Sequence, residues 1–380
     1  TLSLSEADKG KEEVTRRTEA TKPIAKSPCR SVNQRELADF VLQHHKDKTR
    51  TLVILNTVKR AQELYAQLKK KHPDCELVLI HSRFRPTERS RAIERLLNNP
   101  EVKGTICVTT QVIEAGVDVS CRLMVTELAP WASLIQRFGR CNRDGRERDA
   151  RIYWLDLDLN KKGQSAPYNS QDLQNARHIL HGLGDAKPSN LPHLQDDPQY
   201  LHVLRKKDLI DLFDTTPDLA GSDIDVSRFI READDHNLQV YWRDLGGQPP
   251  SPKEPGPSRE ELCSVSIGSV AAVSDLWKWR WDHLEGEWLS LRNNNELYPG
   301  MVLLLDVSGG CYNAEMGWTG DKRDIPELLS TPESLLESND DDFITASGWQ
   351  TLSEHTEAVV AELKTLLSSL GLTDSEIRKM

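Results

Sequence analysis

The stretch QRFGRCNR (136–143) places two arginines, Arg140 and Arg143, three positions apart. Residues with this spacing share one face of a helix or turn, so both guanidinium groups can approach the same anion. Arginine is always charged and offers forked donors that match phosphate oxygens. Gln136 precedes the pair by one helical turn, and Gly139 lets backbone pass close by. An R-x-x-R pair alone would favour a solvated basic helix end, but the Gln, the Gly and the preceding apolar stretch LMVTE together indicate a phosphate site.

A second candidate segment is TTQVIEAGVDVS (109–120), which directly follows the apolar stretch TICVT. Thr109 and Thr110 would stand at the carboxyl end of a strand, where hydroxyl and amide groups can bind a phosphate backbone. Gly116 permits a turn, and Asp118 can accept a hydrogen bond from a ribose hydroxyl or an arginine. The same residues would also suit an ordinary connection between a strand and a helix.

A third candidate is the end of LVILN (52–56), where Asn56 and Thr57 precede an amphipathic stretch. Thr57 suits the N-cap of that helix, a structural role that is compatible with binding. After the next apolar stretch, HSRF places His81 and Arg83 where either side chain could reach a phosphate.

Short apolar segments rich in β-branched residues must position these side chains. They predict strands at 52–56, 76–80, 105–109, 123–127 and 151–155. Amphipathic patterns predict helices at 34–45, 58–71 and 87–98. Strands that are buried on both faces and separated by helices indicate a parallel sheet, in which ligands gather at the carboxyl ends of the strands.

In this order and spacing, four stretches resemble motifs IV, IVa, V and VI of the second RecA-like domain of superfamily 2 helicases: NTVKRAQELY, HSRFRPTER, TQVIEAGVDVS and PWASLIQRFGRCNRDG. They are most similar to the CRISPR-associated helicase-nuclease of type I interference systems, from Thr51 to about Asp156. By that resemblance, Arg140 and Arg143 act as arginine fingers on the phosphates of ATP, and Gln136 lies near the γ-phosphate.

The same resemblance gives Gly116 and Asp118 a role in coupling the nucleotide state to the grip on a strand. It implies five contacts to the DNA backbone, from Asn56, Thr57, Arg83, Thr109 and Thr110. The sequence contains no G-x-x-x-x-G-K-[ST] and no D-E-x-H box. ATP and Mg²⁺ would therefore be shared with a first RecA-like domain, which precedes residue 1 in the family. The chain alone is expected to be catalytically inactive.

Near the end of the sequence, WQTLSEHTEAVVAEL (349–363) resembles the opening helix of HD-family metal-dependent nucleases. In that family an L-x-E-H-x-x-x-V pattern supplies the first metal-binding histidine, here His355. A lone histidine on an amphipathic helix is more often a surface or core residue. The family's further ligands are not in this sequence, so a site for a divalent transition metal would be incomplete. A nuclease domain in this position fits the variant systems called type I-G or I-U.

Four tryptophans and two basic residues lie close together in WKWRWDHLEGEW (277–288). Aromatic side chains interleaved with cations are typical of single-stranded nucleic-acid binding. Strict alternation instead places Trp277, Trp279 and Trp281 on one face of a strand, with Trp288 further along, where they would pack in a core. We expect the core arrangement.

The composition restricts the kind of protein further. The 380 residues include 59 acidic and 49 basic side chains, a net charge of −10, so any nucleic-acid site must be a local basic groove. Seven cysteines are scattered without a C-x-x-C pair, which is typical of reduced thiols in a cytosol. No stretch approaches the roughly 20 apolar residues that span a membrane. We therefore expect a cytoplasmic protein without a membrane partner.

The expected fold class is α/β, with a RecA-like parallel sheet flanked by helices, a mixed α+β accessory domain and a C-terminal helix at 351–370. The expected divisions are a flexible lead-in with a helix (1–48), the second RecA-like domain (49–158), a linker and accessory domain (159–348), and the start of a truncated HD-type nuclease domain (349–380). The proline-rich stretch GGQPPSPKEPGPSRE (246–260) is predicted as a linker, and the stretch 262–273 after it as a strand.

The function implied by the resemblance is that of the C-terminal half of an ATP-dependent single-stranded DNA translocase or helicase. With a nuclease domain it would degrade target DNA in type I CRISPR interference. Its partners would be single-stranded DNA, the first RecA-like domain and a type I surveillance complex with guide RNA. The alternatives are a catalytically incomplete binding module and a fragment of a DExH-type RNA helicase.

Overall fold

The computed structural model describes residues 10–329 apart from 31–32, 101, 162, 193–205, 207–236, 283–285 and 292. The chain divides into two compact units, Thr1–Leu328 and Leu329–Met380. His355 and the helix expected at 351–370 lie outside the described residues. Within the described part, no helix has both the length and the apolar character needed to cross a membrane.

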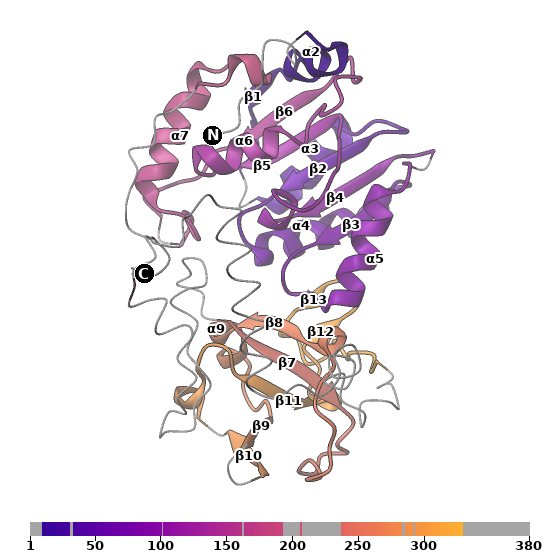
Figure 1. Ribbon diagram of the computed structural model, residues 1–380, viewed down its shortest axis with the longest axis vertical. Coiled ribbons are helices and arrows are strands. Elements are labelled where there is room, and N and C mark those ends of the chain that lie inside the picture. Colours follow the sequence, from indigo (N-terminus) through magenta and orange to yellow (C-terminus); the bar gives the residue numbers. More distant parts are fainter. Residues whose placement is uncertain are drawn as a thin grey trace, which may run out of the picture. The chain divides into compact units, whose positions relative to one another are not determined.

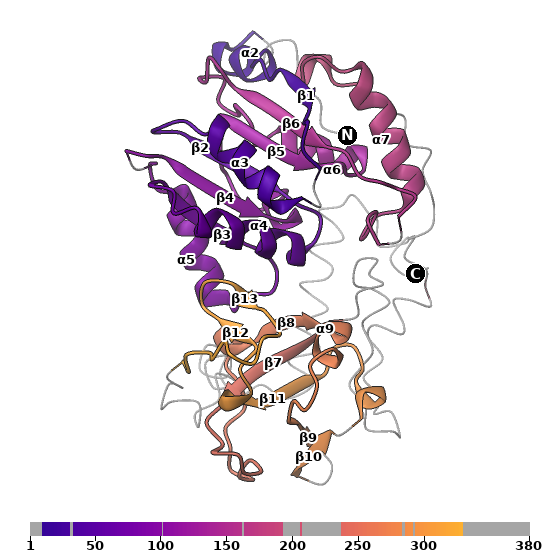
Figure 2. The same cartoon turned by 180° about the vertical axis from the view of Figure 1, so that it is seen from behind.

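A six-stranded sheet has the order β1-β6-β5-β2-β4-β3 (Figures 1 and 2). Its strands are β1 (Ile24–Lys26), β2 (Arg50–Ile54), β3 (Glu76–Ile80), β4 (Thr105–Thr109), β5 (Leu123–Glu127) and β6 (Arg151–Leu155). All neighbours run parallel; Leu52, for example, lies opposite Cys107 on β4 and Met124 on β5. The predicted α/β fold class is confirmed, and each of the five predicted strands is present within two residues.

Helices cover both faces of this sheet, which explains why its central strands are almost wholly apolar. One face packs against α3 (Gln34–His44) and α4 (Val58–Lys70), which are seen best in Figure 2. The other packs against α5 (Pro86–Leu97), α6 (Trp131–Phe138) and α7 (Ser170–Gly182). Along β2, Val53 belongs to the first core and Leu52 and Ile54 to the second, because successive side chains of a strand point to opposite faces.

The flexible lead-in predicted before the first helix is wrong for the described residues of that segment. They form α2 (Glu12–Thr18) and β1, and β1 pairs in parallel with β6. In α2, acidic residues occupy the first turn and basic residues the last, which favours a helix through its dipole. Ile24 of β1 is buried in the core, so the segment forms the edge of the sheet.

The polar stretch after β6, assigned from the sequence to a linker, contains α7. Leu173, Ala176 and Leu180 of this helix are buried against the sheet. Their spacing of three and four residues is that of an amphipathic helix. The polar Asn, Gln and His residues between these positions make the helical spacing of the apolar residues hard to recognise in the sequence.

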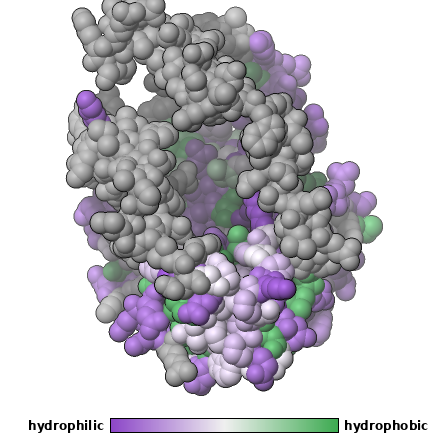
Figure 3. Space-filling model, turned by 60° about the horizontal axis from the view of Figure 1, so that its bottom comes forward, coloured by the Kyte–Doolittle hydropathy of each residue, from purple (hydrophilic) through white to green (hydrophobic). Residues whose placement is uncertain are grey.

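A second, mixed sheet has the order β10-β9-β11-β7-β8. Its strands are β7 (Asn237–Arg243), β8 (Cys263–Ser266), β9 (Lys278–Asp282), β10 (Glu287–Leu291) and β11 (Val302–Asp306). β11 and β7 run parallel, and the other neighbours are antiparallel. Its main core contains the side chains of Leu238, Val265 and Leu303. The expectation of a mixed accessory structure is confirmed. On the side shown in Figure 3, hydrophobic residues of this region form separate patches among polar ones.

The proline-rich stretch 246–260 is not a linker between domains. It joins β7 to β8, which lie side by side as antiparallel strands of the mixed sheet. The prolines prevent a helix, as expected, but both ends of the stretch return to one sheet. The strand predicted at 262–273 is also too long, because β8 ends at Ser266 and the short helix α9 (Ile267–Ala271) follows.

The tryptophans of 277–288 do not share one buried face. Trp277 precedes β9 and is 56% exposed, whereas Trp279 is 8% exposed and packs with Tyr241. Trp281 and Trp288 form an edge-to-face pair with ring centroids 5.2 Å apart. The core prediction is therefore confirmed for Trp279 and wrong for Trp277.

Candidate functional site

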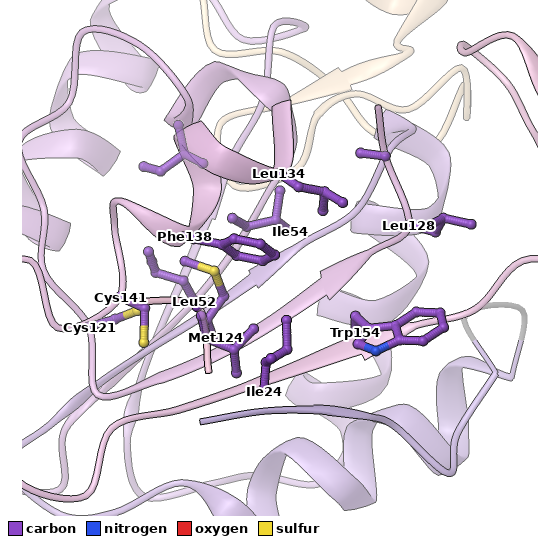
Figure 4. Close-up of a cluster of buried hydrophobic side chains, with 14 of the residues drawn as sticks. Ile24, Leu52, Ile54, Cys121, Met124, Leu128, Leu134, Phe138, Cys141 and Trp154 are labelled. Atoms are coloured by element: carbon purple, nitrogen blue, oxygen red, sulfur yellow. The ribbon is translucent and has the colours of Figure 1, made fainter. Parts of the chain in front are cut away.

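The loop after β4 and the helix α6 after β5 cross the same face of the parallel sheet. Figure 4 shows that face, with Leu134 and Phe138 of α6 above the strands and Cys121 beside Cys141. The amide of Cys121 donates to the carbonyl of Arg140 over 2.9 Å, and the amide of Asn142 donates to the carbonyl of Cys121 over 2.9 Å. These bonds join the ends of the two segments that carry the candidate phosphate-binding residues.

Arg140 is held against the loop after β4. Its Nε donates to the carbonyl of Ile113 over 3.1 Å, and its Nη2 donates to the carbonyl of Glu114 over 2.7 Å. The residue is 9% exposed, and burial, followed by the neighbouring Arg143, lowers its pKa. Its Nη1 has no hydrogen-bond partner among the described residues. The guanidinium is thus fixed in orientation and still has donors for an anion.

Arg143 forms an ion pair with Asp118, with 2.7 Å between Nε and Oδ1. The two side chains are 36% and 81% exposed, so water screens the pair and it contributes less than about 1 kcal/mol. Gly116, at φ +78°, shapes the exposed turn before Asp118. Gln136 is also exposed, one helical turn before Arg140. The structure therefore brings the motif V and motif VI candidates together, with Gln136, Arg143, Gly116 and Asp118 accessible and Arg140 nearly buried beside them.

Arg137, which the sequence analysis passed over, lies at the centre of a buried polar network. Its guanidinium donates to Oε1 of Glu114 (2.8 Å), Oδ1 of Asn56 (3.2 Å), Oγ1 of Thr126 (3.0 Å), the carbonyl of Glu127 (3.1 Å) and the hydroxyl of Tyr168 (3.1 Å). The position was detectable, because Arg137 follows the apolar Leu134 by three residues on the buried face of α6. This arginine fixes α6 on the sheet and is not available to a ligand.

Three of the five predicted DNA contacts are buried in this structure: Asn56, Thr109 and Thr110. Asn56 uses its amide and side chain internally, donating to Glu127 and Leu128 and accepting from Arg137. As placed, these three side chains are enclosed in the protein and are not presented to a strand. Thr57 is half-buried, and its hydroxyl accepts from the amide of Arg60 over 3.4 Å as the N-cap of α4.

The loop after β3 packs against a hairpin formed by β12 (Tyr312–Asn313) and β13 (Gly317–Trp318). The amide of Trp318 donates to the carbonyl of Arg83 over 2.9 Å, and Nη2 of Arg83 donates to Ser266 over 3.2 Å. His81 is buried, and its Nε2 is 3.0 Å from the carbonyl of Met316. Burial lowers the pKa of His81 to about 3, so the ring is neutral at physiological pH and does not serve as a phosphate contact.

A further feature missed from the sequence is the support that the N-terminal segment gives to α6. The buried ammonium of Lys22 donates to the carbonyl of Phe138, at the end of α6, over 3.0 Å. Nδ2 of Asn142 donates to the carbonyl of Thr21 over 3.0 Å, and Nε of Arg16 donates to the carbonyl of Asp144 over 2.9 Å. Residues 16–22 therefore brace the loop that carries Arg143.

The parallel sheet and the meeting of the segments after β4 and β5 agree with the RecA-like α/β domain expected from the sequence. Residues 47–146 match the family model for the C-terminal part of "CRISPR-associated nuclease/helicase Cas3". The chain thus contains a Cas3-like helicase C-terminal region, and the resemblance expected from its motifs is confirmed.

Two curated proteins and one solved structure are among the most similar. "CRISPR-associated helicase Cas3" of Thermoproteus tenax is 34% identical over 133 residues, and "Putative CRISPR-associated nuclease/helicase Cas3" of Methanocaldococcus jannaschii is 28% identical over 229 residues. The matches cover 34% and 54% of this chain but only 21% and 30% of those proteins. A "Crystal structure of CRISPR-associated protein" shares the fold with a TM-score of 0.54 and 18% identity, over 83% of this chain and 42% of that one.

Proposed function

We propose that this chain supplies the second RecA-like domain of an ATP-dependent translocase for single-stranded DNA. In type I CRISPR interference the motor would act with a nuclease, recruited by a surveillance complex with guide RNA. The names of the relatives, which are nuclease/helicases and helicases, support this proposal. The observation that carries it is the convergence of the two segments: exposed Arg143 and Gln136 lie with the nearly buried guanidinium of Arg140 beside the loop of Gly116 and Asp118.

In this proposal a first RecA-like domain holds ATP and Mg²⁺, and the present chain closes on the phosphates. Arg140 suits this role because two of its nitrogens are fixed on backbone carbonyls while Nη1 stays available. The guanidinium does not have to be reorganised when charge develops on a phosphate, which is how preorganised donors accelerate phosphoryl transfer. Gln136 would lie near the γ-phosphate and orient the groups there.

Asp118 would keep Arg143 positioned until the nucleotide is present. Their ion pair is exposed and therefore weak, so a polyphosphate can compete for the guanidinium at low cost. Exchange of Asp118 for phosphate would also release the exposed turn at Gly116, while Arg140 keeps hold of Ile113 and Glu114. We propose this exchange as the link between the nucleotide state and the grip on DNA.

We further propose contacts to the DNA backbone and a nuclease metal site. Thr57 and Arg83 are partly accessible at the carboxyl edge of the sheet, so the proposed backbone contacts now depend on these two residues and their loops. A transition-metal site at His355 rests on the resemblance of its helix to HD-family nucleases. Within the residues that the structure describes, no group of three or more His, Cys, Asp or Glu side chains is placed to hold a metal.

The test joins this chain to its first RecA-like domain and measures ATP turnover with single-stranded DNA. Arg143→Ala should lower turnover by roughly 10³-fold or more, as arginine fingers do in other phosphoryl-transfer enzymes, with DNA affinity nearly unchanged. Arg95→Ala is the matched control, because Arg95 is also an exposed arginine in an ion pair, with 2.8 Å between its Nε and Oε1 of Glu76. A decrease of less than tenfold for Arg143→Ala, or an equal decrease for both variants, would refute the role of Arg143.

A further inference from the structure

The mixed sheet contains a cavity of about 940 Å³ beside the start of β9. The loop after β7, the segment between α9 and β9, and the end of β10 form its walls. Cavities that hold small ligands occupy roughly 300–1,000 Å³, so this one has room for a nucleotide-sized group. None of the residues that line it belongs to the proposed ATP-facing surface.

Lys278 gives this cavity a positive charge that is incompletely compensated. The side chain is 5% exposed, and its Nζ donates to Oδ1 of Asn294 over 2.8 Å. Lys278 has no acidic ion-pair partner within the described part of the chain. A buried cation is unfavourable without full charge compensation; burial lowers the pKa of Lys278, and the nearby carboxylate of Glu296 offsets this only in part. An anion entering the cavity would supply the missing charge.

Two tryptophans flank this lysine in the sequence and line the same cavity. Trp277 is 56% exposed, which is unusual for a large aromatic side chain that no core requires. Trp279 is 8% exposed, and its indole N–H has no hydrogen-bond partner in the part of the structure described. The cavity thus offers an accessible ring for stacking next to a cation in two consecutive residues, whereas the indole N–H of Trp279 is enclosed in the protein.

We infer that this cavity binds one nucleotide of a single DNA strand, with its base stacked on Trp277 and its phosphate near Lys278. An aromatic ring next to a cation matches the two chemical parts of a nucleotide. The lining includes the polar side chains of Gln248, Ser290 and Asn294, which suit a polar strand better than an apolar partner. The inference rests on the proposed function and adds a contact with the strand outside the RecA-like domain.

One acidic residue of the cavity opposes this binding. Asp275 is exposed and lines the same cavity, so it repels a phosphate there. The contact is therefore expected to be one nucleotide long and dominated by stacking. Replacing Asp275 with Asn should strengthen binding, whereas replacing Lys278 should weaken it.

The experiment measures the affinity of the chain for a fluorescein-labelled oligothymidylate by anisotropy. Trp277→Ala should weaken binding about tenfold, within the range for loss of one base–aromatic stack, and Trp277→Phe should retain most of it. Tyr298→Ala is the matched control, because Tyr298 is 42% exposed in the same region and does not line the cavity. Equal affinities for Trp277→Ala, Tyr298→Ala and the unchanged chain would overturn the inference.

The salt dependence tests the phosphate contact separately. Lys278→Met should reduce the slope of log affinity against log salt by about 0.7, the contribution of one phosphate in a single strand, and Lys278→Arg should preserve it. An unchanged slope in a folded Lys278→Met variant overturns the assignment. Thymidine monophosphate that binds as tightly as the oligonucleotide, in a Trp277-dependent way, also overturns it in favour of a free nucleotide.

These outcomes are distinguishable from failure of the proposed function. If the unchanged chain binds no oligonucleotide, the inference fails, and the Arg143 effect on ATP turnover of the joined domains decides the translocase proposal separately. If the chain binds DNA and Arg143→Ala lowers ATP turnover, but the Trp277 variants leave the oligonucleotide affinity unchanged, only the inference fails.

Discussion

Replacement of Arg137 by methionine should destabilise the protein without touching a ligand. Methionine fills a similar volume but leaves the oxygens of Asn56, Thr126 and Glu127 without the guanidinium donor. Each buried polar group without a partner costs about 1–3 kcal/mol, and removal of one member of a buried ion pair costs about 3–5 kcal/mol. Because Glu114 is partly exposed and can be hydrated, we expect a loss of about 3–5 kcal/mol in the free energy of unfolding.

The assay is urea unfolding followed by tryptophan fluorescence, with Arg143→Met as the matched control. Arg143 makes a screened ion pair, so the same substitution there should cost less than about 1 kcal/mol. The two substitutions are thus expected to have different effects: that of Arg137 lowers stability, and that of Arg143 lowers ATP turnover. Equal stabilities of the two variants would refute the distinction between a buried structural arginine and an exposed functional one.

Two further predictions concern the contact between the loop after β3 and the β12–β13 hairpin. Burial lowers the pKa of His81 from 6.5 to about 3, so below pH 6.5 the unfolded chain binds a proton that the folded chain excludes. The free energy of unfolding is therefore highest above pH 6.5. Well below pH 6.5 it falls by about 1.4 kcal/mol per pH unit. Urea unfolding should show a total loss of about 1.4 kcal/mol between pH 7.5 and 5.5, since the full slope is reached only below pH 5.5, and an undiminished loss in His81→Gln would contradict it. A Cβ on Gly317, at φ +68°, would lie 2.4 Å from the carbonyl oxygen of Arg83. Gly320 has a similar φ, but a Cβ there would meet no atom closer than 3.7 Å. Gly317→Ala should therefore lower the free energy of unfolding by about 1–3 kcal/mol more than Gly320→Ala, and equal thermal stabilities would exclude the clash.

The elements with strong apolar patterns were predictable, and those with short or diluted patterns were not. The three inner strands β2, β4 and β5 are almost continuously buried, and β3 and β6 keep mainly apolar sequences, a pattern typical of a parallel sheet covered on both faces. β1 has only three residues, so period and composition carry almost no signal there. In α7 the buried positions follow helical spacing, but a window dominated by polar residues masked them.

The site was predictable in composition and only partly in arrangement. Arg140 and Arg143 were identified from type and spacing, yet the pairing of Arg143 with Asp118 depends on how the loop after β4 returns along α6. The predicted and observed sites differ mainly in which side chains are buried. Asn56 and Thr109 follow or end strands, as predicted, but the sequence does not reveal that the surrounding chain covers them.

The segment 16–22 gives the arginine surface a mechanical connection to the start of the chain. It presses on the loop of Arg143 so closely that a Cβ on Gly145 would lie 2.5 Å from the carbonyl oxygen of Arg16. The buried ammonium of Lys22 meanwhile secures the last turn of α6. Residues 16–22 therefore couple the position of α2 to that of the loop of Arg143. A displacement of α2 would move this loop through direct contacts.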